Sequence, residues 1–481
     1  MEEKNYQPLK NIPFNDKLGY GAGNLGSGII FQALNTYIVF YATAVLNIPG
    51  LLVGLAVGIS IIWDGLTDPV MGYISDRTRL SSLGRRHIYL LLGAFFTALF
   101  NYYLWVISPE LPLNIKFIWL LTGVILVKTF LTIFSTPYVA MGAELSCDYN
   151  ERTSIQAIRT VFFILGIFLA SALGLYLFFG PTPEYPLGQL NPESYRNLGL
   201  ASSLIMLALG LLTFFITFKY IPRLYQIKEE ESMRLTRGIG GALRGVVIDL
   251  INALKNFDYR AVVLGYLFTN LTVALFAALG LHVFTFTFSM NNTEIAIIVG
   301  TQFILSILSQ PPWVKISARL DKKPAALLGL GLSLLAGLLL LAAVFYRAQI
   351  RENYLLLLPY AILAGFGTGG LFTLPASMVA DIIDVAELRN GVRLEGIYYG
   401  GLTFAYKTSQ SIAILLLGIF LDLIGFDAAR DFQPEETLML MGLMLAVGGM
   451  FFIIMAFIFY RKYRLDQETI SRIQRRIDRI D

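Results

Sequence analysis

The stretch IIWDGLTDPVMGYISDRTR, residues 61–79, places two aspartates, Asp64 and Asp68, inside an apolar run. If the run is helical, the two carboxylates lie four residues apart and share one face. A charge near the centre of a bilayer costs about 2.5–3.5 kcal/mol on insertion scales, so such groups usually face the protein interior and mark a function. Whether this run crosses a membrane therefore decides what the carboxylates can do.

The rest of the chain is as apolar as this stretch. Of its 481 residues, 56% are hydrophobic and only 15% are charged, and the mean hydropathy is +0.64. Soluble domains average about 25% charged residues, so this chain lacks the polar surface to stay dissolved. No hydrophilic segment exceeds about 40 residues, which is short for an independent soluble core. We predict an all-α membrane protein.

Apolar runs near the 20 residues that a membrane helix needs predict twelve transmembrane helices. They are expected near residues 18–46, 50–75, 88–108, 116–144, 154–180, 197–221, 260–289, 294–314, 324–346, 353–384, 396–425 and 434–460. The longest polar stretch lies between the sixth and seventh of these spans. The prediction is an N-terminal six-helix bundle (1–221), a cytoplasmic central loop (222–258), a C-terminal six-helix bundle (259–460) and a cytoplasmic tail (461–481).

The two halves carry related segments at matching places. GYISDRTRLSSLGRR follows the second predicted span, and KISARLDKKP follows the eighth. Such parallel repeats are typical of transporters whose halves rock around a central site. The central loop includes RLTRGIGGALRGVVIDLINALKNF, which favours a helix lying along the cytoplasmic membrane surface.

The basic residues orient the chain. Of the 37 lysines and arginines, 29 fall in the termini and in alternate loops beginning with residues 77–86. The opposite loops hold five: Lys116, Arg196, Arg347, Arg351 and Arg430. The positive-inside rule therefore places both termini in the cytoplasm. The N-terminal residues lack the apolar region of a signal peptide, so we expect a multi-pass protein of the plasma (bacterial inner) membrane, targeted by its first span.

Three basic residues remain within predicted spans: Lys128, Arg159 and Lys407. Lys407 lies halfway along the eleventh span, and a buried ammonium needs a carboxylate partner, for which the Asp64 and Asp68 pair is the candidate. Snorkelling to the interface is its alternative. Arg159 suits a ligand hydroxyl or carboxylate, or equally the cytoplasmic interface. Lys128 receives no role.

Charged residues at the predicted cytoplasmic ends of the spans form a candidate gate. DIIDVAELRNGVRLEG, from Asp381, alternates in sign. The predicted gating charges are Asp76, Arg77, Glu144, Arg152, Asp381, Asp384, Arg393 and Glu395. Pairs that close in one state and separate in another can bias alternating access. Ordinary solvated loop charge is the alternative for about half of them.

Catalytic chemistry has little support. The chain has two histidines and one cysteine, Cys147, and it lacks the HExxH, GxSxG and P-loop motifs. The basic excess follows membrane topology, so no nucleic-acid partner is expected. A cation held between the two aspartates removes their repulsion, and carboxylate oxygens suit hard ions such as Na⁺. The prediction is a transporter with no cofactor beyond a coupling ion.

Several motifs together resemble the glycoside–pentoside–hexuronide:cation symporter family of the major facilitator superfamily, whose familiar member is melibiose permease. The similarity runs nearly end to end. It is carried by KLGYGAGNLG, IWDGLTDPVMGYI, PYVAMGAEL, ERTSIQAIR, MVADIIDVAEL, VRLEGIYYG, the mid-helix Lys407 and YRLDQETISRIQRRI. The resemblance implies the major facilitator fold of two six-helix bundles and cation-coupled symport.

The resemblance also implies roles for individual residues. Asp64 and Asp68 match the carboxylates that bind the coupling Na⁺, H⁺ or Li⁺, and Thr132 matches a hydroxyl of that site. Lys407 matches a lysine that interacts with the carboxylate pair and takes part in sugar recognition. Arg159 matches an arginine that binds sugar. Tyr138, an aromatic with a polar tip inside a span, is a further candidate for the substrate surface.

The sequence departs from the family at the sugar. Gly28 and Ser135 stand where melibiose permease has galactoside-binding aspartates, Val139 replaces a tryptophan, and Ile61 replaces an arginine. Losing two such carboxylates should cost several kcal/mol, so melibiose is not expected as substrate. The prediction is Na⁺- or H⁺-coupled transport of a sugar, glycoside or sugar acid by a monomer. The alternative is a sodium-coupled lysophospholipid symporter of the same fold.

Overall fold

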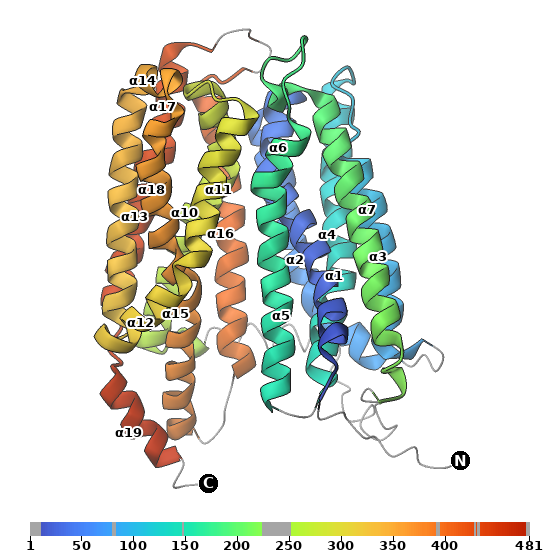
Figure 1. Ribbon diagram of the computed structural model, residues 1–481, viewed down its shortest axis with the longest axis vertical. Helices are drawn as coiled ribbons and strands as arrows, with labels where there is room; N and C mark the ends of the chain where they lie inside the picture. The colour runs from blue at the N-terminus through green and yellow to red at the C-terminus, as the bar shows by residue number, and fades with distance from the viewer. Residues whose placement is uncertain are drawn as a thin grey trace. The chain divides into compact units, whose positions relative to one another are not determined.

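The computed structural model describes residues 11–78, 83–146, 149–223, 252–390, 395–427, 430 and 433–477. They form helices joined by short loops (Figure 1). The chain divides into two compact units, Met1–Ala242 and Leu243–Asp481. This division falls inside the segment predicted as the central loop. The helix predicted along the membrane surface falls mostly on residues 224–251, outside the described residues.

The described residues of the first unit form seven α-helices. They are α1 (Phe14–Phe40), α2 (Gly50–Arg77), α3 (Gly84–Leu104), α4 (Leu113–Glu144), α5 (Tyr149–Phe168), α6 (Gly174–Phe178) and α7 (Pro192–Phe218). A π-helical turn, η1 (Tyr41–Val45), extends α1, and another, η2 (Leu169–Leu173), joins α5 to α6. Two 3₁₀ turns, η3 (Gly188–Leu190) and η4 (Ile221–Arg223), flank α7.

The second unit is built from a similar series. Its α-helices are α10 (Phe257–His282), α11 (Asn292–Leu308), α12 (Gln310–Leu320), α13 (Lys322–Phe345), α14 (Arg347–Glu352), α15 (Leu358–Asn390), α16 (Glu395–Leu423), α17 (Glu435–Leu443), α18 (Gly449–Arg461) and α19 (Gln467–Ile477). The π turns η5 (Val283–Thr287) and η7 (Met444–Gly448) and the 3₁₀ turn η6 (Tyr354–Leu357) complete it.

Within the described residues, eleven helices are long and apolar enough to cross a membrane. The pair α11 and α12 is bent by 44° and makes the twelfth span if it is counted as one. The sequence predicted a continuous helix over 294–314, so this span is corrected to a broken one. Pro311 and Pro312 follow the break, and proline removes a backbone hydrogen bond and clashes with the preceding turn.

Asparagines begin three of the long helices. The Asn191 side chain accepts from the Glu193 backbone N–H and precedes Pro192 at the first position of α7. Asn256 caps α10 in the same way. Asn291 and Glu294 form a reciprocal capping box at the start of α11. These caps fix where the chain re-enters an apolar helix, because they satisfy N–H groups that have no partner within the helix.

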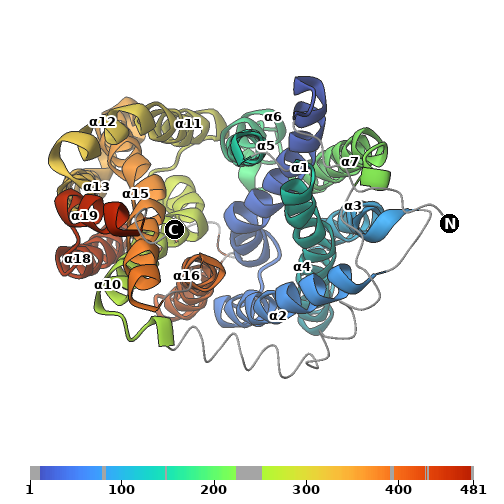
Figure 2. The same cartoon turned by 90° about the horizontal axis from the view of Figure 1, so that it is seen from below.

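Helix α1 is the central element of the first unit, packed against α5 and α7, while α3 packs on α4 and α7 and α2 packs on α4 (Figure 2). Glycines let these helices approach closely. A Cβ added at Gly28 in α1 would lie 2.5 Å from the Phe163 carbonyl oxygen of α5. A Cβ added at Gly166 would lie 2.4 Å from the Leu25 carbonyl oxygen. The backbones of α1 and α5 are therefore in contact at this crossing.

The second unit repeats this pattern of neighbours. Helix α10 packs on α16 and α18, α13 packs on α15 and α18, and α11 packs on α15. The likeness extends to local detail. The turn η1 is followed by Asn47 at φ 53°, and η5 is followed by Ser289 at φ 54°. The described parts of the two units thus share one helical plan, as parallel repeats require.

Ion pairs tie together the ends of the helices in each unit. Glu144 at the end of α4 accepts from Arg86 Nη2 at 2.6 Å and also pairs with Arg85, both at the start of α3. In the second unit, Asp381 of α15 pairs with Lys322 at the start of α13, with Nζ and Oδ2 2.6 Å apart. Because α4 corresponds to α15 and α3 to α13, the two units use the same clamp.

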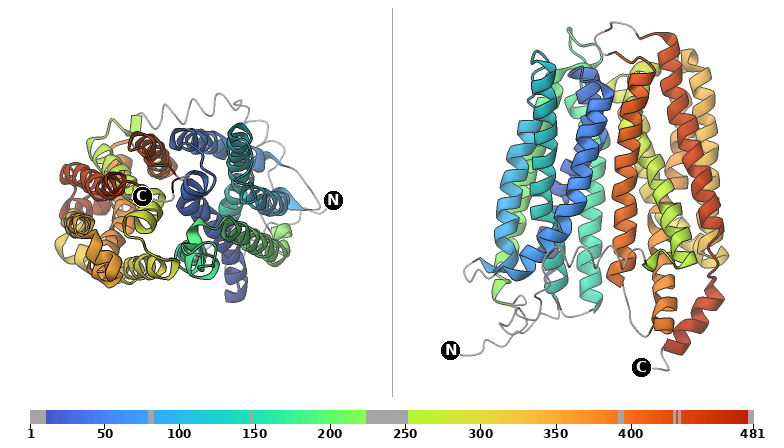
Figure 3. Two further views of the ribbon diagram at one scale, coloured as in Figure 1. Left: turned by 90° about the horizontal axis from the view of Figure 1, so that it is seen from above. Right: turned by 180° about the vertical axis from the view of Figure 1, so that it is seen from behind.

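The chain after α18 joins the clamp of the second unit. The Tyr463 hydroxyl donates to Asp381 Oδ2 at 3.2 Å. Burial, with the nearby Asp381 charge, raises the pKa of Tyr463, so this hydroxyl keeps its proton for that hydrogen bond. The Gln467 backbone N–H donates to Asp321 Oδ2 at 3.0 Å, and α19 then packs on α15 (Figure 3).

Candidate cation and substrate site

The two aspartates meet a single hydroxyl group. Asp64 and Asp68 lie one turn apart on α2, both half-buried, and Thr132 on α4 is buried between the helices. Thr132 Oγ1 lies 3.0 Å from Asp64 Oδ1 and 2.9 Å from Asp68 Oδ1. The structure therefore brings together the three residues that were predicted to hold the cation.

The single hydrogen of the Thr132 hydroxyl faces two carboxylate oxygens. A threonine hydroxyl has one hydrogen and can donate it fully to one acceptor. Thr132 nevertheless has a carboxylate oxygen within 3.0 Å on each side. The second contact becomes favourable when a carboxyl carries a proton or a cation lies among the oxygens. Three converging oxygens, two of them from carboxylates, suit a hard monovalent ion or a proton.

Two further contacts hold α2 and α4 in this register. The Trp63 indole N–H donates to Thr129 Oγ1 at 2.8 Å. On the other side of Thr132, a Cβ added at Gly72 would lie 3.7 Å from Thr136 Cγ2. A stripe of α4 threonines (129, 132 and 136) thus faces α2, with the carboxylates at its middle. Sequence reasoning missed Trp63 and Thr129, although their spacing beside Asp64 and Thr132 was visible.

Removing the Thr132 hydroxyl is expected to weaken cation binding. Since a neutral hydrogen bond or oxygen contact contributes about 1 kcal/mol, Thr132→Val should raise the Na⁺ midpoint by about three- to tenfold. The midpoint is measured as Na⁺-induced thermal stabilisation at constant ionic strength. Thr132→Ser should keep the wild-type midpoint. Thr122→Val, on the exposed side of α4, is the control. An unchanged midpoint in Thr132→Val would exclude the hydroxyl from the site.

The predicted substrate residues are spread over both units. Arg159 lies on α5, where its carbonyl oxygen accepts from Asn24 Nδ2 of α1 at 2.9 Å. Its Nε is buried and donates no hydrogen bond within the described part of the chain, which leaves a donor available to a ligand. Ser135 is half-buried on α4, three residues after Thr132. Lys407 is half-buried near the middle of α16 in the second unit, so its expected pairing with the carboxylates stays a prediction.

Tyr138, predicted for the substrate surface, is a packing residue in this structure, and its role toward substrate stays a prediction. Its side chain is fully buried, and its hydroxyl donates to the Tyr20 carbonyl oxygen at 2.7 Å. The Tyr20 hydroxyl donates to the Tyr138 carbonyl oxygen at 2.9 Å, and the two rings stack at 4.5 Å. This reciprocal pair fastens α1 to α4 and leaves the Tyr138 ring covered.

Gly28, also predicted as a substrate position, packs against α5 in this structure, and its role toward substrate stays a prediction. It is buried where α1 and α5 cross, and a side chain there would meet the backbone of Phe163. The packing agrees with the absence of a sugar-binding aspartate at this position, because the crossing has room for a hydrogen but not for a carboxylate. The exposed Val139 lies on the same side of α4 as Ser135, one turn further on.

The predicted gating charges fall into two groups. Glu144 and Asp381 pair with basic residues of their own unit, as described above, and Asp384 is buried on α15. Asp76 and Arg77 end α2, Arg152 lies in the first turn of α5, and Glu395 begins α16. Arg393 lies outside the described residues. The structure thus assigns Glu144 and Asp381 to clamps within each unit, and a gate between the units stays a prediction.

Breaking the clamp of the first unit is expected to destabilise the protein. The side chains of Glu144 and Arg86 are only 16% and 6% exposed, so Glu144→Gln removes the carboxylate charge of a buried ion pair. Removing one partner of a buried ion pair costs about 3–5 kcal/mol, which we expect to lower the melting temperature by about 3–8 °C. Glu435→Gln is the matched control, because Glu435 is 61% exposed in its pair with Arg347. Equal shifts in both variants would contradict the clamp.

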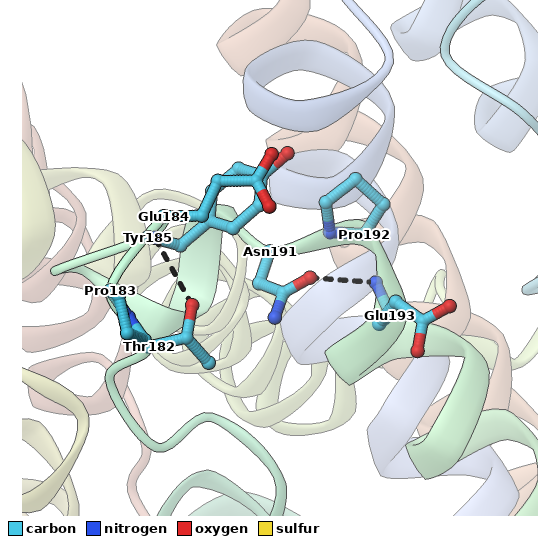
Figure 4. A pocket seen from close by; sticks show the side chains of 7 residues that line it. All are labelled: Thr182, Pro183, Glu184, Tyr185, Asn191, Pro192 and Glu193. Atoms are coloured by element: carbon cyan, nitrogen blue, oxygen red, sulfur yellow. Dashed lines mark hydrogen bonds between the residues drawn. The ribbon is translucent and has the colours of Figure 1, made fainter.

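The described surface also has a hollow in the loop between α6 and α7. Figure 4 shows its lining, with the Asn191 side chain bonded to the Glu193 backbone and Thr182 bonded to the Tyr185 backbone. These bonds are internal to the loop, and none of the predicted site residues lines it. We assign it to the connection between the helices.

Comparison with known proteins identifies the family. The family model described as MFS/sugar transport protein matches residues 19–467, nearly the whole chain. The chain belongs to this family. The match confirms the resemblance to the glycoside–pentoside–hexuronide:cation symporters and the prediction that this MFS protein is a transporter and not an enzyme.

Relatives of this MFS protein are named as symporters and transporters and come from several organisms. An uncharacterized symporter of Synechocystis is 27% identical over 88% of both chains. The mouse sodium-dependent lysophosphatidylcholine symporter 1 is 23% identical over 97% of this chain and 88% of its own. The isoprimeverose transporter of Lactiplantibacillus pentosus is 22% identical over 97% of this chain and 92% of its own.

Solved structures agree on the fold of this MFS protein. A bacterial homologue of the human lysosomal transporter Spinster superposes with a TM-score of 0.68 at 12% identity, over 93% of this chain and 97% of the other. The predicted all-α major facilitator fold is confirmed. With the family match and the apolar spans, this MFS protein is a multi-pass membrane transporter.

Proposed function

We propose that this protein is a cation-coupled symporter of a sugar, glycoside or sugar acid, working by alternating access. The observation that carries the proposal is the Thr132 hydroxyl within 3.0 Å of both carboxylates, inside an apolar helix pair. Na⁺ or H⁺ is the coupling ion, Asp64 and Asp68 bind it, and no other cofactor is needed. The protein acts as a monomer in the plasma (bacterial inner) membrane, with both termini cytoplasmic.

Coupling follows from charge. The empty carboxylate pair is costly in an apolar bundle, and a bound cation removes that cost. If the loaded site favours substrate binding, then by linkage the substrate tightens the cation by the same factor. Arg159, with its buried Nε, and Ser135 supply polar contacts for the substrate from the first unit, and Lys407 supplies a charge from the second. Movement of the cation down its gradient then drives the substrate.

A sodium-coupled lysophospholipid symporter is the second candidate. It is favoured by one relative, a sodium-dependent lysophosphatidylcholine symporter as similar to this chain as the isoprimeverose transporter is. The lack of carboxylates at Gly28 and Ser135 and the exposed Val139 also suit an amphiphile better than they suit a galactoside. The carboxylate pair keeps its role under both candidates.

The test is thermal stabilisation of the purified protein by a panel of ligands, with and without Na⁺ at fixed ionic strength and pH. The panel contains isoprimeverose, methyl β-D-xyloside, D-glucuronate, D-galacturonate and lysophosphatidylcholine. A ligand present at 100 times its Kd stabilises the folded state by about 2.7 kcal/mol. A sugar, glycoside or sugar acid whose effect is larger with Na⁺ or at lower pH supports the main proposal. Stabilisation by lysophosphatidylcholine alone supports the second.

A further inference from the structure

Lys128 lies on α4 one helical turn before Thr132, and the sequence left it without a role. It is half-buried inside a span of mean hydropathy 2.1. Side chains four residues apart on a helix are neighbours, with their Cβ atoms about 6 Å apart. The lysine therefore belongs to the same stretch of α4 that meets α2.

Two cross-helix bonds fix the level of Lys128 against α2. Its neighbour Thr129 accepts from the Trp63 indole, which adjoins Asp64 in sequence. One turn further along, Thr132 contacts Asp64 itself at 3.0 Å. Because α4 runs past α2 in this register, the flexible four-carbon stem of Lys128 starts within reach of the carboxylate pair.

Other cations of the first unit are engaged elsewhere. Among those whose side chains the structure describes, the contacts are Lys17 with Glu151, Arg85 and Arg86 with Glu144, Lys219 with Asp16, Arg196 with Tyr102, and Lys116 with the Leu46 and Pro109 carbonyl oxygens. Arg159 lies on α5, where its charge acts on Tyr20 and Tyr138. On α4, Lys128 is the described cation that lies one turn from Thr132.

We propose that the Lys128 ammonium is a tethered cation of the coupling-ion site. It neutralises one of the two carboxylate charges, which leaves a single negative charge for one monovalent ion. It also competes with Na⁺ for the carboxylate oxygens, so it lowers the affinity of the site for Na⁺. This inference rests on the proposed function of Asp64 and Asp68 as the coupling-ion ligands, and it makes Lys128 the residue that sets ion affinity and number.

The experiment is a Na⁺ titration of the melting temperature of the purified full-length protein, with choline replacing Na⁺ at constant ionic strength and pH. The wild type is compared with Lys128→Met, Lys128→Gln and Lys128→Arg. Removing a unit charge about one turn from the ion should lower the Na⁺ midpoint at least tenfold in Lys128→Met and Lys128→Gln. Lys128→Arg keeps the charge and should stay within about threefold of the wild type. Two neutral variants are used so that misfolding of one leaves the test intact.

Two controls separate this inference from its premise. Arg196→Gln also removes a positive charge from the first unit, at an exposed position of α7, and a shift below about threefold would show that the Lys128 effect is local. Asp64→Asn tests the premise, because a Na⁺ response unchanged from wild type there would refute the proposed function itself. If Asp64→Asn loses the Na⁺ response, the premise holds. An unchanged or absent Na⁺ response in Lys128→Met and Lys128→Gln would then overturn only the inference about Lys128.

One outcome would reassign Lys128. If the Na⁺ midpoint stayed constant while stabilisation by D-galacturonate or D-glucuronate was lost in Lys128→Met and Lys128→Gln, the ammonium would belong to an anionic substrate. That result overturns the tethered-cation inference. The residue would then join Ser135 and Arg159 in the substrate site.

Discussion

Replacing either Asp64 or Asp68 by asparagine is expected to abolish concentrative uptake. The substitution keeps the size and part of the hydrogen bonding to Thr132 but removes one of the two charges that hold the ion. With one ion per substrate, a tenfold inward cation gradient supports accumulation of about tenfold. In each variant, the internal and external substrate concentrations should become equal. The measurement is uptake into proteoliposomes of the panel compound that stabilises the wild type.

The control for this prediction is Glu352→Gln, which removes an exposed carboxylate at the end of α14. It should accumulate substrate as the wild type does. Exchange of substrate between the two sides needs no net ion movement, so it should persist in the aspartate variants and show that they are folded. Concentrative uptake that survived in both Asp64→Asn and Asp68→Asn would refute the mechanism.

Introducing an aspartate at Gly28 is expected to prevent folding of the first unit and not to create a sugar site. A Cβ there would lie 2.5 Å from the Phe163 carbonyl oxygen, which belongs to the backbone of α5 and cannot rotate away. Overpacking alone costs about 1–3 kcal/mol, and an unpaired buried carboxylate adds several more. We expect the monodisperse peak of Gly28→Asp in size-exclusion chromatography to be lost.

Alanine variants separate the steric cost from the charge. Gly28→Ala should lower the melting temperature by several degrees, since the steric clash alone remains. Gly58→Ala is its matched control, because a Cβ at Gly58 in α2 would meet nothing within 4 Å. That variant should be neutral or slightly stabilised by the higher helix propensity of alanine. A well-folded Gly28→Asp that gained galactoside binding would show that α1 and α5 can separate at this crossing.

The spans could be predicted because apolar length is a direct requirement of the bilayer. The residues predicted for α1, α2, α4 and α7 fall on single long helices, with ends shifted by a few residues. The break between α11 and α12 was missed although Pro311 and Pro312 were visible, since prolines within membrane helices are often accommodated by neighbouring groups. The π turns were also missed, because one extra residue per turn leaves no mark in hydropathy.

The cation site could be predicted further than the substrate site. Asp64 and Asp68 stand out because charge is rare inside a span, and their spacing fixes a common face. Thr132 came from the family resemblance, and the structure then placed it against both carboxylates. The burial of Tyr138 and Gly28 could not be predicted, because it depends on which helices cross, and a single sequence does not reveal that. Lys128 acquired meaning only through the register set by Trp63 and Thr129.

The π turns η1 and η5 occupy corresponding places in the two halves of the chain. In each half the first long helix ends in a five-residue π turn, followed two residues later by a non-glycine residue with positive φ, at positions 242 residues apart. A π turn is a rare interruption of an α-helix. Its recurrence with a positive-φ residue at the same offset therefore marks equivalent registers in the two halves, as expected of parallel repeats.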